Sequence, residues 1–371
     1  MRSAFIEVDL RRLALNVDLL CRSAGERKLM AIVKGNAYGH GAVPVAQVAL
    51  QAGAQWLGVA TQSEAEEIRH AGIVAPMLIL GHLRPDEYET CARHNVSVTV
   101  SDPLAIDQAS HVAARAGRTL GVQIKLDTGM GRIGARPQDA VELGRRIASS
   151  EHLRFEGVFS HLSSAGTDDA FTQRQIAFFQ TALTRLDKAG LLPPWRHIRN
   201  SAGTLGGYEA DGTNLVRTGI AMYGLNPDGV SAPPKGLQPV MSVHAHVNFV
   251  KRVPKGTPVG YGQTYVADRE IQIATLGIGY ADGYRRSYSG RARVLIGGMH
   301  WRVAGRISMD QTTVAVDSDF PVSVGDEAIL MGRQKDREVT AEELASLIGT
   351  INYEVVTGMS ARLPRVYRPR S

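Results

Sequence analysis

The sequence has 371 residues, of which 44% are hydrophobic and 21% charged, a mixture typical of a globular protein large enough for two domains. The formal net charge is +6, but basic and acidic residues are interspersed, which argues against a nucleic-acid partner. No apolar stretch has the length of a membrane span, and Glu7 and Asp9 lie where a signal peptide needs an apolar core. The two cysteines, Cys21 and Cys91, have no CxxC spacing, so we expect a cytoplasmic protein with free thiols.

From residue 28 to about 220, short apolar runs alternate with amphipathic stretches of helical periodicity. The expected strands are 29–34, 56–60, 77–80, 96–100, 120–126, 154–160, 195–199 and 213–217. The expected helices include 42–52, 62–71, 86–94, 103–116, 138–149 and 169–189. Repeated units of this length imply parallel strands, and about eight of them imply a closed (β/α)8 barrel of the TIM type.

The pattern changes after a segment rich in proline and glycine, residues 226–238. Glycine-separated apolar runs follow and predict a mainly antiparallel β domain. These runs are Met241–Val250, Ile271–Ile278, Val294–Ile296, Thr312–Val316 and Glu327–Leu330. A helix over about 340–348 interrupts them, with Thr340 as its expected N-cap. The expected domains are therefore 1–235, the barrel, and 236–371, the β domain. The first strand, about 3–9, is a candidate to join the β domain.

Lys34 is the first residue that suggests chemistry, because it ends an apolar strand where its charge is costly to bury. Desolvation there lowers the pKa of the amine and makes it a nucleophile. Lysine is also scarce, since only 8 of the 42 basic residues are lysine. On the strand-Lys-turn pattern alone, a surface lysine that closes the strand is the simpler explanation.

Other polar residues also follow expected strands of the barrel. Lys125, His161, Ser201 and Arg217 all lie at or just after a strand end, as Lys34 does. Function in a (β/α)8 barrel sits at the carboxyl ends of the strands. Five independent surface residues would not be expected to share this placement, so the pattern predicts one site.

Several longer segments strengthen that prediction. They are Ala31–Gly41, Lys125–Gly134, Phe159–Leu162, His197–Gly203, Asn214–Gly224, Val259–Tyr265, Ile278–Gly283, Arg306–Gln311 and Asn352–Glu354. Taken singly, an Asn-Ser-Ala triplet or two tyrosines in a glycine-rich loop is a weak signal. Together and in this order, the segments resemble those of the alanine racemases, a family of pyridoxal phosphate (PLP) enzymes with a barrel fold. The resemblance runs from Ile6 to Arg365.

The resemblance implies a two-base racemase. In that family the lysine at the position of Lys34 forms the Schiff base with the cofactor, and the tyrosine at the position of Tyr261 is the second base. A racemase needs acid/base groups on both faces of one planar carbanion. Tyrosine ordinarily titrates near pH 10, so it acts as a base only where a cation stabilises the phenolate.

The same resemblance assigns residues around the cofactor. Arg217 would face the pyridine nitrogen, and since arginine has no acceptor atom and keeps its protons, that nitrogen would stay largely neutral. His161 would hydrogen-bond to Arg217. The remaining contacts expected to bind the cofactor, most of them at its phosphate, come from Tyr38, Ser201, Gly219, Ile220 and Tyr353.

Substrate contacts follow in the same way. Arg132 would polarise the cofactor's phenolic oxygen and bind the substrate carboxylate, and Lys125 matches a lysine that is carbamylated in some relatives. The residues that complete the substrate site are Met309, through its amide, Asp310, and the entrance tyrosines Tyr265 and Tyr280. No metal is expected. Ser308 and Gly358 stand where the family often has cysteine, which should not affect the chemistry.

The sequence thus predicts racemisation of L- and D-alanine by a PLP enzyme. The family forms homodimers in which the β domain covers the partner's barrel, so a shared active site is expected. A barrel-type decarboxylase is disfavoured because those enzymes usually place a carboxylate, not Arg217, at the pyridine nitrogen. A cofactor-homeostasis protein of the same fold would lack the second domain. A racemase for serine or lysine stays open, as does the choice between cell-wall synthesis and alanine catabolism.

Overall fold

The computed structural model describes residues 3–369, and the chain divides into two compact units. The first, called here the barrel unit, comprises residues 13–37 and 41–222. The second, called the β unit, comprises residues 3–12, 38–40 and 223–369 of the described chain.

Strands and helices alternate through the barrel unit. Its strands are β2 (Lys28–Ile32), β3 (Trp56–Val59), β4 (Met77–Ile79), β5 (Val98–Val100), β6 (Leu120–Lys125), β7 (Leu153–Phe159), β8 (Trp195–His197) and β9 (Leu215–Thr218). Its helices are most of α1 (Leu10–Ala24), then α3 (Ala42–Gln51), α4 (Gln62–His70), α5 (Tyr88–Arg93), α6 (Pro103–Arg115), α7 (Ala140–Ala148), α8 (Asp169–Lys188) and the short α9 (Ser201–Leu205). The predicted alternation is confirmed.

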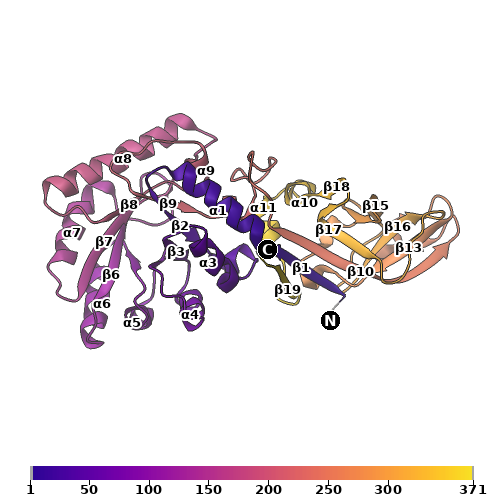
Figure 1. Cartoon of the computed structure of the whole chain (residues 1–371), viewed down its shortest axis with the longest axis horizontal. Coiled ribbons are helices and arrows are strands. Elements are labelled where there is room, and N and C mark those ends of the chain that lie inside the picture. Colours follow the sequence, from indigo (N-terminus) through magenta and orange to yellow (C-terminus); the bar gives the residue numbers. More distant parts are fainter. Residues whose placement is uncertain (1–2, 370–371) are drawn as a thin grey trace. The chain divides into compact units, whose positions relative to one another are not determined.

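The strands of the barrel unit close on themselves. Two parallel sheets, β4-β3-β2-β9 and β5-β6-β7-β8, contain all eight strands. One seam is joined by the Ile79 amide, which donates to the Ser97 carbonyl at 2.9 Å. The other is joined by the Arg217 amide, which donates to the Arg199 carbonyl at 3.0 Å. With both seams joined the sheet is a barrel, and Figure 1 shows the helices around its outside.

Local sequence explains where the helices of the barrel unit begin. Thr61 caps α4 through a capping box with Glu64, and Asp102 caps α6, where Pro103 occupies the first helical turn. These are positions at which a side-chain oxygen satisfies an amide that the helix leaves without a partner. The strands are buried on both faces, which is why β6 reads as a continuous buried run.

The β unit is mainly antiparallel. Its strands are β1 (Ala4–Asp9), β10 (Met241–Val253), β11 (Pro258–Val259), β12 (Tyr265–Val266), β13 (Ile271–Leu276), β14 (Arg293–Ile296), β15 (Met299–Val303), β16 (Thr312–Asp317), β17 (Glu327–Gln334), β18 (Arg337–Val339) and β19 (Arg365–Arg368). Its helices are α10 (Ala341–Ile348), for which Thr340 is the N-cap as predicted, and α11 (Asn352–Thr357). The predicted fold class is confirmed in this unit too.

The main sheet of the β unit has the order β18-β17-β14-β15-β16-β13-β10-β1-β19. An additional pairing of β10 with β17 closes six of these strands into a ring. β1 extends the ring by pairing antiparallel with β10 and parallel with β19. A small core that includes Val259, Ile271 and Ala304 lies next to Tyr265 and anchors the ends of the loop over residues 260–264.

The structure differs from the prediction mainly at element ends. The strand expected over 29–34 ends at Ile32, and the one expected over 195–199 ends at His197. In both places one backbone bond still reaches the neighbouring strand, from the Val33 amide to the Gly58 carbonyl and from the Arg217 amide to the Arg199 carbonyl, but the regular ladder has ended. The short helices α9 and α11 were not predicted, because five or six residues are too few to show a helical period.

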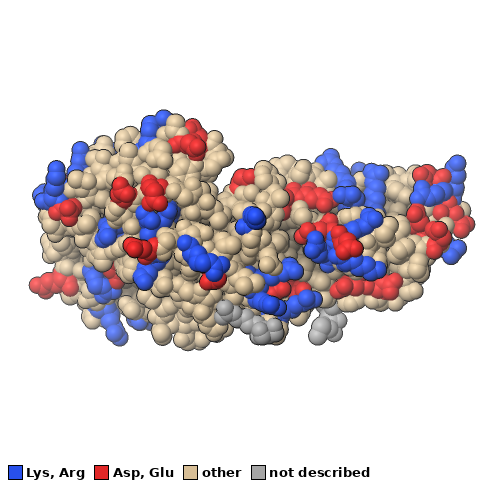
Figure 2. Space-filling view, turned by 45° about the horizontal axis from the view of Figure 1, so that its top comes forward, with Lys and Arg blue, Asp and Glu red and all other residues tan. Residues whose placement is uncertain are grey.

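Charges of both signs lie side by side on the surface. Figure 2 shows blue and red side chains intermixed on the face turned to the viewer. Many are paired, such as Arg146 with Asp107 and Arg269 with Asp317. Among residues 3–369, no helix combines the length and the apolar character that crossing a membrane would need.

Candidate active site

Lys34 stands at the start of a left-handed turn. Gly35, Asn36 and Ala37 have φ values of 63°, 51° and 52°, and Tyr38 follows at 53°. A non-glycine residue in this region costs about 1–2 kcal/mol, so three in a row need support from their surroundings. The turn expected after Lys34 is therefore left-handed and held by neighbouring groups, and the helical stretch that follows it is α3.

Two sets of hydrogen bonds supply that support. The Ala37 amide donates to the Val33 carbonyl at 2.7 Å. The Asn36 side chain accepts from the Ala42 amide at 2.8 Å, and the Asn36 carbonyl accepts from the Gly41 amide at 2.9 Å. The turn is thus tied to the end of β2 on one side and to the start of α3 on the other.

Glu64 adds a third tie. One oxygen of its carboxylate accepts from the Gly35 amide at 2.6 Å, and the other accepts from the Ala60 amide at 2.7 Å. The carboxylate that completes the capping box of α4 therefore also grips the residue directly after Lys34. The sequence showed Glu64 only as a helix-start residue, and its second role was missed because it depends on a contact across 29 residues.

The amine of Lys34 is set up as a nucleophile. Burial lowers the pKa of Lys34, and the positive charge of Arg132 lowers it further, while Glu64 acts in the opposite direction. The net shift is downward. A larger fraction of this amine is therefore unprotonated at neutral pH than in an exposed lysine.

Arg217 lies on β9 with its guanidinium buried. Its Nη1 donates to Nδ1 of His197 at 2.8 Å, and its Nη2 donates to Nδ1 of His161 at 3.1 Å and to the Ser160 carbonyl at 2.6 Å. Burial lowers the pKa of Arg217 to about 9, which leaves it a cation at neutral pH. The expected neighbours Arg217 and His161 are in contact, whereas His197 as a further partner was missed.

Arg217 retains a donor after these bonds. Within the described chain, its Nε hydrogen has no protein acceptor. Burial and the charge of Arg217 lower the pKa of His161 well below its ordinary value, so that imidazole is neutral at pH 7. The Nε hydrogen of Arg217, on a buried cation, can therefore be donated to a bound ligand.

Lys125 is the second unusual lysine of the barrel unit. It lies at the end of β6, is 4% exposed, and its amine is 5.0 Å from the centre of the Phe159 ring. Burial, reinforced by the charges of Arg217 and Arg132, lowers its pKa to about 6. At neutral pH this amine is mostly unprotonated and can react with an electrophile such as CO2.

The loop after β6 presents Arg132 to solvent. Burial alone would raise the pKa of Asp127, but bonds from the Gly129, Gly131 and Met130 amides outweigh it and lower the pKa, so the carboxylate organises the loop. Arg132 itself makes no hydrogen bond or ion pair with any residue the structure describes, which leaves its guanidinium available for an anionic ligand.

Ser201 begins α9 directly after β8. Its Oγ accepts from the Gly219 amide at 2.9 Å and from the Ala221 amide at 3.4 Å, and it keeps its own proton to donate. The Ile220 amide has no acceptor in the part of the chain that is described. A phosphate here would thus receive bonds from Ser201 and Ile220, while the Gly219 amide holds Ser201 in place.

The predicted residues of the β unit are brought together by backbone pairing. The Tyr280 amide donates to the Ser308 carbonyl and the Ala281 amide to the Met309 carbonyl, each at 3.0 Å. The next segment back, around Arg306, lies against Gly260, because a Cβ on that glycine would meet the Arg306 amide nitrogen at 3.2 Å. The segments that carry Tyr261, Tyr280 and Met309 are therefore neighbours.

These side chains are open to solvent. Tyr261 is 69% exposed, Met309 53% and Tyr280 39%. Asp310 is exposed too, and it accepts from the Arg362 guanidinium at 2.5 Å. The exposed rings and the Met309 amide, which has no acceptor among residues 3–369, form a surface ready to contact a ligand.

Tyr38 and Tyr353 lie in the β unit near a third tyrosine, Tyr223. The Tyr38 ring is 4.9 Å from that of Tyr223 and 6.2 Å from that of Tyr353. Burial raises the pKa of Tyr38 to about 12, and it raises that of Tyr353 as well. Tyr353 donates its hydroxyl proton to the Pro227 carbonyl at 3.0 Å, so a bond to phosphate requires that proton to turn away from Pro227.

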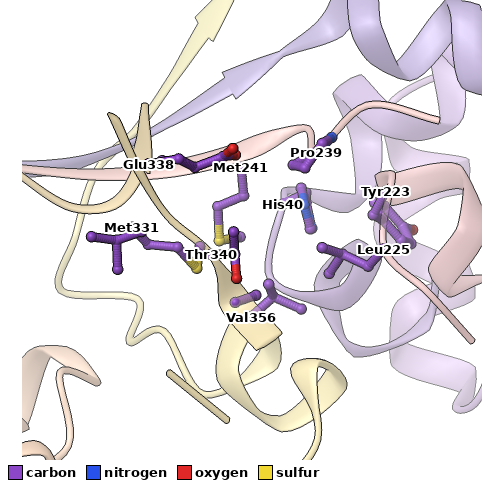
Figure 3. A pocket seen from close by; sticks show the side chains of 12 residues that line it. His40, Tyr223, Leu225, Pro239, Met241, Met331, Glu338, Thr340 and Val356 are labelled. Carbon is purple, nitrogen blue, oxygen red and sulfur yellow. The ribbon is translucent and has the colours of Figure 1, made fainter. Parts of the chain in front are cut away.

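One cavity of the β unit is not part of this site. Figure 3 shows it lined by His40, Tyr223, Met241, Met331 and Val356, among others. Its volume is about 20 Å³, enough for one water molecule. It contains none of the predicted catalytic or substrate residues.

The barrel unit therefore holds three groups whose bonding capacity is not used up by the protein. They are the amine of Lys34, the Nε hydrogen of Arg217 and the hydroxyl of Ser201. These groups match three parts of one cofactor. The amine can react with an aldehyde, the Nε hydrogen can be donated to a ring nitrogen, and the hydroxyl can be donated to a phosphate. This donor set fits pyridoxal phosphate.

Two family models match the chain. The family described as alanine racemase, N-terminal domain, matches residues 8–227. The family described as alanine racemase, C-terminal domain, matches residues 240–367. Together they account for nearly all of the described chain.

Curated relatives with the same name match over almost the full length. The alanine racemase of Symbiobacterium thermophilum is 45% identical over 368 residues, covering 99% of this chain and 97% of the relative. That of Carboxydothermus hydrogenoformans is 40% identical over 370 residues, covering 99% and 100%.

Solved structures agree with this. The crystal structure of alanine racemase from Streptomyces lavendulae is 40% identical and superposes with a TM-score of 0.93, covering 100% of this chain and 98% of that one. The structure from Bacillus anthracis with bound L-Ala-P is 37% identical, with a TM-score of 0.91 over 100% and 96%.

Proposed function

Since the chain belongs to the alanine racemase family, we propose that it interconverts L- and D-alanine with pyridoxal phosphate attached to Lys34. The observation that carries this proposal is the set of three unused groups in the barrel unit, on a chain that matches alanine racemases from end to end. The amine of Lys34, half-buried and close to the positive charges of Arg132 and Arg217, is the nucleophile that a carbonyl cofactor needs.

Lys34 and Tyr261 are the two bases of this proposal. When bound, pyridoxal phosphate withdraws the electron pair that the amino acid keeps after losing its α-proton. Lys34 takes or returns that proton at its Nζ on one face, and Tyr261 does so at its hydroxyl on the other. The lowered pKa of Lys34 supports its role, because a base must be unprotonated at the working pH.

Arg217 holds the cofactor ring and does not protonate it. Its guanidinium can donate a hydrogen bond to the ring nitrogen through Nε but has no proton to lose at neutral pH. With its ring nitrogen left neutral, the cofactor would be a weaker electron sink, which would favour return of the proton to the substrate carbon. His161 and the Ser160 carbonyl keep the guanidinium in place.

The phosphate contacts of the proposal are Ser201 and the Ile220 amide, with Gly219 behind Ser201. Tyr353 joins them if its hydroxyl leaves Pro227. Tyr38, whose ring lies 6.2 Å from the Tyr353 ring, is proposed as a further cofactor contact.

Arg132 is proposed to bind the substrate carboxylate and the phenolic oxygen of the cofactor, and its free guanidinium supports this. Lys125 is proposed as a lysine that adds CO2 at Nζ with release of a proton, giving a carbamate that orients Arg132. A pKa of about 6 supplies the unprotonated amine that this reaction needs. Carbon-13 bicarbonate would give a carbamate NMR signal in the wild type that is absent in Lys125→Met.

In the β unit, the Met309 amide and Asp310 are proposed to contact the substrate, and Tyr265 and Tyr280 to narrow the entrance. We propose a homodimer in which Tyr261 and Met309 of one chain complete the site that contains Lys34 of the other. The exposure of Tyr261 and Met309 supports this, since catalytic groups do not usually remain open to solvent. We also place the enzyme in the cytoplasm, in line with two free cysteines.

The test is racemisation by the purified protein, followed by chiral chromatography with L-alanine, L-serine and L-lysine supplied separately. We expect D-alanine to form fastest and the starting L-alanine to approach an equal mixture. Faster conversion of serine or lysine would replace the substrate in this proposal, and release of CO2 from any of them would identify a decarboxylase. Borohydride should trap the cofactor on the Lys34 peptide, and its recovery on Lys125 would contradict the assignment.

A further inference from the structure

A row of buried polar side chains crosses the interior of the barrel unit behind Arg217. Gln123 on β6 and His197 on β8 are both 0% exposed, and Arg217 on β9 is 3% exposed. The Arg217 guanidinium lies 2.8 Å from Nδ1 of His197, and Nε2 of the same imidazole lies 2.8 Å from Oε1 of Gln123. His197 is thus held at both of its ring nitrogens.

The direction of these bonds follows from the chemistry of arginine. A guanidinium has only donors, so Nδ1 of His197 must be the acceptor. An imidazole that accepts at Nδ1 and is neutral carries its proton on Nε2. Burial and the charge of Arg217 keep His197 neutral, since they lower its pKa well below the ordinary value. The Nε2 proton then needs an acceptor, and Gln123 Oε1 is the one in reach.

We infer that Gln123 is a positioning residue that fixes His197 with its proton on Nε2 and thereby holds Arg217 in the orientation that faces the cofactor ring. The inference rests on the proposed function, in which Arg217 sets the protonation of that ring. Gln123 touches neither cofactor nor substrate and acts through His197.

The barrel unit is built to accommodate this glutamine. Gly157 on the neighbouring strand β7 leaves it room, since a Cβ at that position would lie 2.7 Å from Gln123 Oε1. Phe159, two residues further along β7, stacks on the His197 ring at 4.8 Å with an angle of 5° between the planes. The imidazole can therefore neither tilt nor exchange its two nitrogens without displacing a packed neighbour.

The other half of the Gln123 amide supports the same conclusion. Its Nε2 is buried and has no hydrogen-bond partner in the described residues. Leaving such a buried donor unpaired is unfavourable, so a purely structural position would be expected to carry an apolar residue. Turning the amide over would bring two N–H groups together at His197. Because Oε1 of Gln123 has to face the His197 imidazole, its Nε2 is left without a partner.

Two variants separate this role from simple packing. Gln123→Met keeps the length of the side chain and removes the acceptor, whereas Gln123→Glu keeps an acceptor oxygen for the His197 proton. Gln272→Met is the matched control, because Gln272 is also a buried glutamine but lies in the β unit, where it donates to three carbonyls.

The first measurement uses cofactor-free full-length protein with nitrogen-15 histidine. Two-bond proton–nitrogen spectra report which ring nitrogen of His197 carries the proton, with His197→Asn identifying the signal. We expect only the Nε2–H form in the wild type, Gln123→Glu and Gln272→Met, and a substantial share of the Nδ1–H form in Gln123→Met. A wild-type His197 that carries its proton on Nδ1, or on both nitrogens, would overturn the inference even if the methionine variant fails to fold.

The second measurement uses the loaded enzyme. In Gln123→Met, kcat for racemisation should fall roughly 10- to 100-fold, as it does when a group that orients a ligand from behind is removed, with KM nearly unchanged. Pyruvate formed per racemisation should rise, because a displaced Arg217 no longer controls the ring nitrogen. Gln123→Glu should recover most of the lost kcat. Gln272→Met should change neither kcat nor the pyruvate formed per racemisation.

The outcomes distinguish a failure of the role of Gln123 from a failure of the proposed function. If the wild type racemises alanine while Gln123→Met keeps the wild-type tautomer and the wild-type pyruvate ratio, the role of Gln123 is wrong and the proposed function stands. If the wild type racemises no amino acid, the proposed function is wrong, and the tautomer spectra alone decide whether Gln123 sets His197.

Discussion

The strand ends of the barrel unit and the exposed loops of the β unit prepare their candidate residues in opposite ways. In the barrel unit, Arg217 and Lys125 are nearly buried, and desolvation shifts the pKa of each far from its ordinary value. In the β unit, Tyr261 and Met309 are more than half exposed, and only turns and backbone pairing place them.

The difference shows two routes to a functional side chain. Burial activates a group before any ligand arrives, at the expense of fold stability, because charged forms are disfavoured inside the protein. Positioning on an exposed loop leaves stability untouched but also leaves the group in water until something covers it. The predictions below test whether the two units really divide the work in this way.

The largest effect should come from Lys34→Ala, which removes the proposed cofactor anchor and one base together. Racemisation should fall at least about 10³-fold, toward the upper end of what a missing acid/base group costs. Thermal unfolding of the cofactor-free protein should change little, since the Lys34 side chain makes no hydrogen bond that the described structure would lose. Retention of more than a tenth of the activity would show that the barrel unit does not carry the anchor at this position.

Arg217→Glu should have the next largest effect. A carboxylate can exchange a proton with the ring nitrogen, which the arginine cannot, so racemisation should fall about 100-fold while pyruvate formation from alanine rises. Chiral chromatography and a pyruvate assay on the same samples give both rates. An unchanged ratio of the two products would reduce Arg217 to a structural residue of the barrel interior.

Lys125→Met tests whether burial of the Lys125 amine lowers the stability of the folded protein. Lysine titrates near pH 10.4 in an unfolded chain but near 6 in the folded barrel unit. Between these values the unfolded chain holds the extra proton, so the stability of the wild type rises with pH.

The methionine variant lacks this dependence and should be the more stable protein at pH 7. Its advantage should shrink by about 2.7 kcal/mol between pH 7 and pH 9, as measured by urea unfolding of both proteins in CO2-free buffer. A constant difference across this range would mean that the Lys125 amine is not desolvated in the folded protein.

Mixing variants tests whether the exposed residues of the β unit serve a partner chain. Lys34→Ala and Tyr261→Phe chains are each poorly active, but a mixed dimer has one site with both changes and one with neither. If chains pair at random, about half of the dimers are mixed, and activity should recover to roughly a quarter of the wild-type value. Exchange of chains without recovery would place both bases in one chain.

The smallest effect is expected at the left-handed turn. Ala37→Gly should stabilise the protein by about 0.5–1 kcal/mol, because glycine relieves the strained φ of 52° but adds freedom to the unfolded chain. Activity should fall several-fold as Lys34 becomes less rigidly placed. Ala46→Gly, in the right-handed helix α3, is the control and should destabilise by about 1 kcal/mol. A loss of stability in Ala37→Gly would show that the turn is not strained.

Much of the fold could be read from short-range pattern. The alternation of apolar runs with helical periods from residue 28 onward indicated the barrel, and the glycine-separated runs after residue 238 indicated the antiparallel sheet. Strand ends were not predicted as closely, because hydrophobicity continues past the end of β2 at Ile32 to Val33. The short helices α9 and α11 could not be predicted from a period that they are too short to display.

The sequence by itself determined which residue types stand at which strand ends, and so predicted Lys34, Lys125, His161, Ser201 and Arg217 to form one group. Only the tertiary structure showed the partners of that group, Glu64, His197 and Gln123 above all. A capping glutamate or a strand glutamine looks ordinary in sequence, because its neighbours along the chain say nothing about contacts that closing the barrel creates. Burial and long-range hydrogen bonds, which decide the charge and orientation of each functional group, arise only when the strands meet.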